Sequence, residues 1–142
     1  MVITARNGAF SAVFAVYSVR PIKQLRVEKS ALKSENGKVI PKEAISVRYV
    51  DGEVLQEKAP ELVSAAKGAP VAARRLWVMV SVPQEAAAGA YRGRLKIFAA
   101  EEEPVTVPIE LTVADWTLAD PHKFETFFDL VQSPETLAKK YE

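Results

Sequence analysis

The chain has 142 residues, of which 49% are hydrophobic and 26% charged, a balance typical of one globular domain. Nineteen lysines and arginines offset eighteen aspartates and glutamates, so a formal charge of +1 provides no broad basic field and argues against a nucleic-acid partner. The absence of cysteine excludes a thiolate nucleophile, a CxxC redox pair and cysteine-ligated zinc or iron–sulfur clusters.

The N-terminal residues lack the basic start and continuous apolar stretch of a secretion signal. The longest apolar run, Phe10–Val19, reaches only about half of the ~18 residues that a membrane span needs. We therefore expect no membrane segment, and a protein that is either cytoplasmic or exported with its signal removed.

The first half of the chain predicts three strands. Phe10–Val19 is apolar on both faces, which is typical of a central strand buried between two layers. Pro21 ends this run, and residues 22–28 alternate as a half-exposed second strand. The sequence Ser-Glu-Asn-Gly at 34–37 predicts a turn, and Ile45–Tyr49 predicts the third strand.

The periodicity disappears from Glu53 to Arg74, where we expect a long surface loop. Loops of this length are uncommon in small domains, and one could cover a sheet edge or reach a partner. We favour a connection that crosses between two sheets, because loops run over protein surfaces. Glu61–Ala65 has the composition of a short helical turn within that loop.

Three further strands are predicted at 76–83, 91–97 and 105–113, the last two with clean alternation of apolar and polar residues. Ala99–Pro104, with three consecutive glutamates, is the expected hairpin loop. Pro108 lacks an N–H group and would break a central ladder, so we place it at an edge or a bulge.

After Val113 the pattern leaves the sheet. Phe124–Gln132 begins a new apolar run, Ser133 offers a helix N-cap and Pro134 the first helical position. A strand followed by a helix is typical of the opening unit of a β/α domain. The prediction is therefore an all-β, immunoglobulin-like antiparallel β-sandwich of about seven strands over 3–115, with a short strand–helix tail. The domains are 1–115, a linker at 116–123 and the start of a truncated β/α domain at 124–142.

Several stretches of the chain together resemble the non-catalytic N-terminal β-sandwich of glycoside hydrolase family 123 and related uncharacterised proteins. The combination of a strand–turn–strand phrase with a later Asp-Leu-x-Gln-x-Pro segment is more specific than any one stretch. The stretches that carry the resemblance are Ala5-Arg6-Asn7, Leu76-Trp77 to Val82-Pro83, Ala88 to Gly93, Val107 to Leu111, Trp116 to Pro121 and Phe128 to Pro134.

The resemblance implies a larger parent protein whose (β/α)8 barrel starts near Phe124 and cleaves glycosidic bonds to N-acetylated hexosamines. In that family the acetamido group of the substrate assists, and an adjacent Asp–Glu pair orients it and supplies the acid. This chain contains no such dipeptide, so the pair would lie beyond Glu142. Val131, Ala119 and Gly8 depart from the residues that are common in the family, which leaves room for a different substrate. A bacterial parent of this kind would be secreted, periplasmic or at the cell surface.

Four residues are candidates for contact with sugar. Asp129 and Gln132 would lie at the carboxyl end of the first barrel strand, the face where barrels hold their active sites, and would bind substrate only in the intact parent. Trp77 and Trp116 could stack on a pyranose ring, whereas packing in a strand and at the domain junction is the competing interpretation.

The remaining polar groups point to no metal and no cofactor. His122 is the single histidine and lies in the linker, and a basic stripe at residues 92, 94 and 96 is expected to face solvent. Asp51, Glu53 and Asp115 do not have the spacing of a calcium loop.

Two functional hypotheses remain for the chain. It is an accessory domain that supports the following barrel, or a separate carbohydrate-binding or adhesive module. An enzyme is disfavoured because the sequence shows no nucleophile with a base and no spaced carboxylate pair. Exposure of Trp77, Tyr49 and Tyr17 on one face would favour the module, and an apolar patch left uncovered near the tail would favour the accessory domain.

Overall fold

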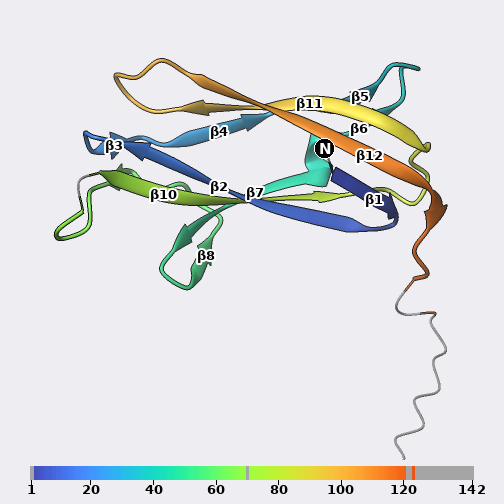
Figure 1. The fold of residues 1–142 in the computed structure, drawn as a ribbon, viewed down its shortest axis with the longest axis horizontal. Helices are drawn as coiled ribbons and strands as arrows, with labels where there is room; N and C mark the ends of the chain where they lie inside the picture. Colours follow the sequence, from blue (N-terminus) through green and yellow to red (C-terminus); the bar gives the residue numbers. More distant parts are fainter. Residues whose placement is uncertain (1, 70, 121–122, 124–142) are drawn as a thin grey trace, which may run out of the picture.

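The computed structural model describes residues 2–69, 71–120 and 123, and these residues form a β-sandwich. Two sheets form the two layers, which Figure 1 shows one above the other. The six-stranded sheet contains β1 (Val2–Arg6), β4 (Arg26–Lys29), β5 (Leu32–Ser34), β6 (Val39–Ile40), β11 (Gly89–Phe98) and β12 (Val105–Thr117). The four-stranded sheet contains β2 (Ala9–Ser18), β7 (Ile45–Asp51), β8 (Val54–Gln56) and β10 (Ala72–Ser81), and a separate pair joins β3 (Ile22–Lys23) to β9 (Leu62–Val63).

The predicted all-β sandwich is confirmed, with one strand pair that departs from the antiparallel pattern. In the six-stranded sheet the order is β1-β12-β11-β5-β6, and β4 lies beside β5 along the same edge of β11. The first and last strands, β1 and β12, run parallel. Both ends of the described chain therefore belong to the same edge of this sheet.

The prediction that Phe10–Val19 is a central strand was wrong. The order of the four-stranded sheet is β2-β10-β7-β8, so β2 is an edge strand and β10 holds a central position. Side chains on the outer face of β2 are exposed, Val13 to 53% and Tyr17 to 73%. The apolar residues on both faces of β2 thus reflect an uncovered outer face and not burial between layers.

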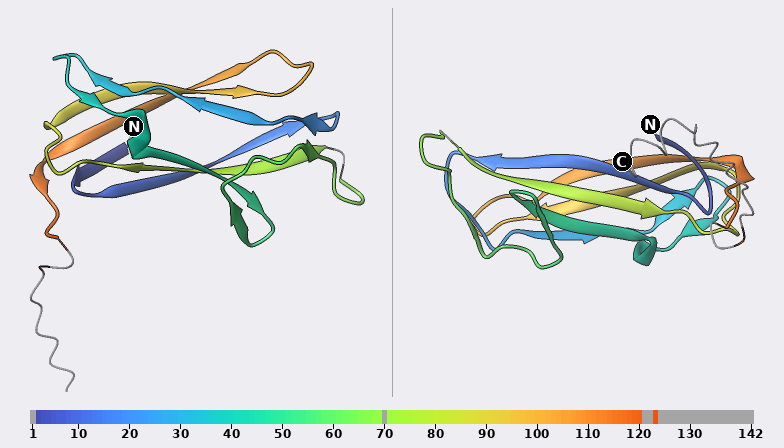
Figure 2. Two further views of the ribbon diagram at one scale, coloured as in Figure 1. Left: turned by 180° about the vertical axis from the view of Figure 1, so that it is seen from behind. Right: turned by 90° about the horizontal axis from the view of Figure 1, so that it is seen from below.

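The segment from Glu53 to Arg74 also differs from its prediction. It connects β7 to β10, which are neighbours in one sheet, and so it does not cross between the sheets. The turn at Gly52, with φ 61°, begins a β7–β8 hairpin that projects from the sandwich (Figure 2). The expected helical turn at Glu61–Ala65 is instead β9, because Val63 is buried opposite Ile22 of β3.

Local turn chemistry gave better predictions. The turn at 34–37 joins β5 to β6, with Gly37 at φ 74° and the Lys38 N–H donating to Ser34 Oγ over 3.0 Å. Residues 99–104 form the β11–β12 hairpin loop. Pro108 lies where β12 pairs with β11 on one side only, since the pairing with β1 begins at Leu111. Its missing N–H is therefore tolerated at an edge, as expected.

The interior contains two clusters of buried apolar side chains. The proximal cluster lies toward the end of β12, and the distal cluster lies toward β3 and β9. The proximal cluster comprises Leu32, Ile40, Ile45, Val78, Val80, Val82, Tyr91, Leu95, Leu111 and Val113. The distal cluster comprises Ile22, Leu25, Tyr49, Val63, Ala72, Leu76 and Ile97.

Candidate functional site

The strongest candidate site is the end of the sandwich where β12 finishes. β12 extends to Thr117, which is paired with Arg6 of β1, two residues beyond the predicted end of the domain. The Leu118 N–H donates to the Arg6 carbonyl over 2.9 Å, and Asn7 Nδ2 donates to the Leu118 carbonyl over 3.1 Å. These bonds fix the chain up to Leu118 against the β1–β2 turn, so its direction at this point is set by the sandwich.

Packing and charge reinforce this attachment. Gly8 is buried, and a Cβ atom there would lie 3.0 Å from the Ala5 carbonyl oxygen and 3.1 Å from Leu118 Cδ1. A larger residue at position 8 would push Leu118 away. Arg6 forms an ion pair with Asp115, and both residues belong to the paired strands β1 and β12. The segment from Asp115 to Leu118, which we call the exit segment, is therefore held by backbone, side-chain and ionic contacts together.

Large apolar side chains are nevertheless left open to solvent at this end. Ile3 on β1 is 64% exposed, Trp116 at the end of β12 is 56% exposed, and Leu118 is 43% exposed. We call these three residues the exit patch. The parallel pairing of β1 with β12 puts these residues on neighbouring segments of the sandwich, and exposed apolar side chains that adjoin one another mark contact surfaces more often than scattered ones do. Trp116 was among the residues predicted from the sequence, but Ile3 and Leu118 were not, because their exposure depends on where β1 pairs.

The aromatic residues of the four-stranded sheet divide between its two faces. Trp77 of β10 is half-buried on the outer face, between Val13 of β2 and Arg48 of β7. Tyr17 lies on the same face, four residues along β2 from Val13. Tyr49 is buried in the distal cluster, where desolvation raises the pKa of its hydroxyl. The structure thus brings Tyr17 and Trp77 to one face, and places Trp116 on the other sheet.

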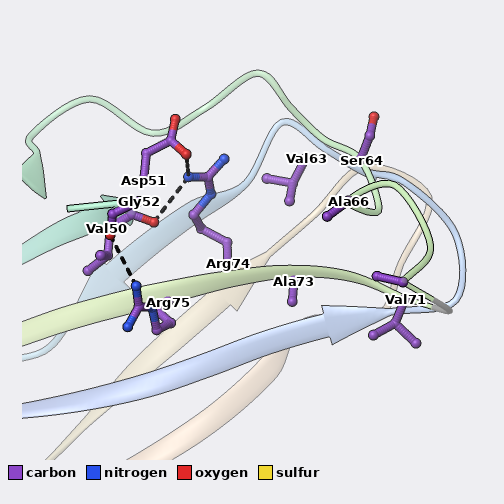
Figure 3. Close-up of a pocket in the computed structure, with 11 residues that line it drawn as sticks. Val50, Asp51, Gly52, Val63, Ser64, Ala66, Val71, Ala73, Arg74 and Arg75 are labelled. Atoms are coloured by element: carbon purple, nitrogen blue, oxygen red, sulfur yellow. Dashed lines mark hydrogen bonds and ion pairs between the residues drawn. The ribbon is translucent and has the colours of Figure 1, made fainter. Parts of the chain in front are cut away.

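A hollow of about 490 Å3 lies beside the loop that precedes β10 (Figure 3). Two arginines in its wall are already engaged. Arg74 Nη1 is 2.7 Å from Asp51 Oδ1 and donates to the Val50 carbonyl over 3.0 Å, and Arg75 Nη2 donates to the Gly52 carbonyl over 3.1 Å. Because these guanidinium groups fasten β10 to the end of β7, they serve the fold.

A smaller hollow of about 240 Å3 opens between the two sheets beside β2. Its walls are mostly apolar and include Phe10 and Phe14 of β2 and Ile109 of β12. It lies along the edge where neither β2 nor the first half of β12 has a second neighbour among the described residues.

Asp129, Gln132 and His122 lie outside the described residues. The basic stripe is exposed on the outer face of β11, where Arg92 is 3.2 Å from Glu35 and 3.6 Å from Glu110. In the part of the chain that the structure describes, no group of three or more His, Cys, Asp or Glu residues is arranged to hold a metal ion. No helix within the same part is long and apolar enough to cross a membrane.

Comparison with known proteins supports the fold. One similar solved structure is a family 123 glycoside hydrolase from Clostridium perfringens, studied for the details of glycolipid glycan hydrolysis, with a TM-score of 0.63 and 16% sequence identity. The match covers 84% of this chain but only 23% of that chain. No family model matches the sequence, and no curated protein matches it. This likeness shows that the chain shares its β-sandwich fold with part of that larger protein.

Proposed function

We propose that the chain is a non-catalytic accessory β-sandwich of a larger carbohydrate-active protein, and that it supports a barrel domain that follows it. The parent protein would be a glycoside hydrolase that acts on N-acetylhexosamine glycans. The observation that carries the proposal is the exit patch, whose apolar side chains are exposed beside the segment that follows β12 and that is held in a fixed direction at Leu118.

Two features support this proposal over an isolated domain. Trp116 and Leu118 belong to the segment that leads away from the sandwich, so a domain that follows directly would be positioned to cover them. Contacts within one chain need little area to persist, because the covalent connection keeps the local concentration of the partner high. The similar glycoside hydrolase, in which the matched part is about a quarter of the chain, is consistent with such an arrangement.

A comparison of two chain lengths tests the role of the exit patch. In the 142-residue chain, Trp116→Ala should change the free energy of unfolding little, because the side chain is 56% exposed. In the parent protein it should cost more than about 1 kcal/mol and separate one thermal transition into two, since a packed interface would be lost. Val39→Ala is the matched control, because Val39 is 54% exposed on β6, away from the exit. Equal effects in both chain lengths would contradict the proposal.

The parent's class has its own test. The coding sequence after Glu142 should continue into a barrel with an adjacent Asp–Glu pair, and the parent should hydrolyse 4-nitrophenyl N-acetylhexosaminides while the 142-residue chain does not. A stop codon directly after Glu142, or hydrolysis by the isolated chain, would overturn this assignment.

A separate carbohydrate-binding module is the second candidate, favoured by the shared face of Tyr17 and Trp77. Four residues of strand separate the position opposite Trp77 from Tyr17, so the two rings are roughly 14 Å apart along the sheet. A glycan that contacts both would span more than one sugar ring. Fluorescence titration with N-acetylated hexosamine oligosaccharides checks this, because Trp77→Ala should abolish the binding and Trp116→Ala should leave it unchanged.

A further inference from the structure

The outer edge of β2 is an uncapped strand edge, and it is unlike the other sheet edges in the described residues. β2 runs through Ala9–Ser18 without a charged residue, a proline or a break in its pairing with β10. The opposite edge of the same sheet is β8, which has three residues. The six-stranded sheet ends in β1, which has five residues and includes Arg6, and in the two-residue β6. Pro108 lies on the open first half of β12, and β4 carries charged residues. Proteins usually shorten, charge or kink an edge strand to prevent its pairing with another chain.

The hydrogen bonds of β2 identify which residues face this edge. The Val82 N–H donates to the Gly8 carbonyl over 2.7 Å, and this pair continues the β2–β10 register by one residue. Hydrogen-bonded and non-hydrogen-bonded pairs alternate in an antiparallel ladder. The even-numbered residues of β2 therefore bond to β10, and the backbone groups of Ala9, Ser11, Val13, Ala15 and Tyr17 point to the free edge.

We infer that the free edge of β2 pairs with β2 of a second copy of this chain, antiparallel and about a two-fold axis at Val13. In this register Ala9 lies opposite Tyr17 of the second copy, and Ser11 lies opposite Ala15. All five free residues then exchange hydrogen bonds, about ten in total. A shift of the pairing by two residues along the strand would leave an end residue unpaired, so the register centred on Val13 satisfies the most backbone groups.

A second copy fits this edge for two physical reasons. β2 carries no charge, so two identical strands can lie side by side without like-charge repulsion. On the inner face the same register puts Phe10 opposite Val16 of the second copy, which would cover the 37% of Phe10 that is exposed and close the adjoining apolar hollow. An isologous contact of this kind is the usual way in which identical chains form closed dimers.

The geometry also leaves the exit patch free. Ala9 marks the end of β2 nearest the exit, and antiparallel pairing places the two Ala9 residues at opposite ends of the joined strands, roughly 27 Å apart. Domains that follow the two copies would therefore point away from each other. The pairing goes beyond the accessory role proposed above and does not depend on it.

Opposite charges at position 13 provide the test. Val13 is 53% exposed and lies on the outer face, so a long charged side chain there does not enter the core. Wild-type chain should sediment as a dimer, and Val13→Lys or Val13→Glu alone should raise the dimer dissociation constant at least about tenfold, because two like charges would meet on the axis. An equimolar mixture of the two variants should restore the dimer. Val54→Lys, at a 61% exposed position on β8, should leave it intact.

A cross-link provides an independent readout that does not depend on charge. The chain contains no cysteine, so Val13→Cys introduces a single thiol. Opposed hydrogen-bonded residues have Cα atoms about 5.5 Å apart, within the range of a disulfide. Mild oxidation should link Val13→Cys quickly and Val54→Cys slowly. The pairing would be overturned if the wild type is a monomer, if the dimer persists in Val13→Lys, or if the mixed variants stay monomeric. A monomeric wild type would indicate that the free edge of β2 is available to a strand of a different protein.

Discussion

The two clusters of the interior differ in how they are closed. Among the described residues, one of the largest fully buried side chains, Leu76, belongs to the distal cluster. The others belong to the proximal cluster, namely Tyr91, Leu95, Leu32, Ile40, Ile45 and Val113. Long paired strands, β11 and β12, cover the proximal cluster. The distal cluster also contains residues of β7, β10 and β11, but its far end is closed by the two-residue strands β3 and β9 and by the loop beside the Arg74 hollow.

Each cluster also contains one buried tyrosine, and the two hydroxyls are held differently. The Tyr91 hydroxyl donates to the Ala87 carbonyl over 2.8 Å and thereby fastens the turn before β11. The hydroxyl of Tyr49 has a backbone hydrogen bond with Val27, but desolvation dominates its environment. The tightly closed half of the sandwich is thus the half that carries the exit patch. A domain that supports another at that end would need such a rigid half.

Truncation of one leucine in each cluster tests this contrast most directly. Leu95→Ala should lower the free energy of unfolding by about 3–5 kcal/mol, because long paired strands cannot collapse into the cavity. Leu25→Ala should cost about 2–3 kcal/mol, since short strands and loops can relax around it. Urea unfolding followed by tryptophan fluorescence measures both values. Equal costs, or a reversed order, would remove the distinction between the two halves.

Overpacking of the proximal cluster gives a smaller effect. A Cβ atom at Gly93 of β11 would lie 2.5 Å from Leu32 Cδ2 and 3.0 Å from the Ala31 carbonyl oxygen. Gly93→Ala should therefore destabilise the fold by about 1–3 kcal/mol. Gly37→Asn is the control, because its Cβ meets nothing within 4 Å and asparagine tolerates positive φ. If the melting temperatures of the two variants agree, the close approach at Gly93 does not limit packing.

The sequence predicted those parts of the fold that depend on local chemistry. Alternation located β11 and β12, and the residues at 34–37 located a turn. The position of β2 could not be predicted in this way, because an apolar run on both faces is compatible with a covered centre or an open edge. Which one occurs depends on whether another strand pairs beyond it, and this is decided by residues far away in the sequence.

The candidate site was predicted only in part, for a related reason. Trp116 was predicted to be a junction residue because the sequence pattern places it after the last strand, whereas β12 continues through it to Thr117. Ile3 and Leu118 become part of the same surface only when β1 pairs in parallel with β12, a contact between the two ends of the described chain. A parallel pair of distant segments leaves no periodic signal in either one, so the exit patch had to be found in the structure.

The smallest expected effect is a loss of stability at alkaline pH that arises in the distal cluster, through Tyr49. Burial raises the pKa of Tyr49 above 10.0, so the folded protein retains the neutral hydroxyl at pH values where the unfolded chain begins to ionise. A raised folded-state pKa contributes stability that is complete below the unfolded value and is lost as pH rises through the folded value.

Wild-type stability should therefore fall more steeply above pH ~10 than that of Tyr49→Phe. Urea unfolding of both chains from neutral pH upward measures this difference, and titration of tyrosinate absorbance identifies the group. Tyr91→Phe should instead lower stability at every pH, because it removes the hydrogen bond to Ala87. If Tyr49→Phe and wild type lose stability in parallel above that pH, then the distal cluster admits water to the hydroxyl and is closed even less tightly than its strands suggest.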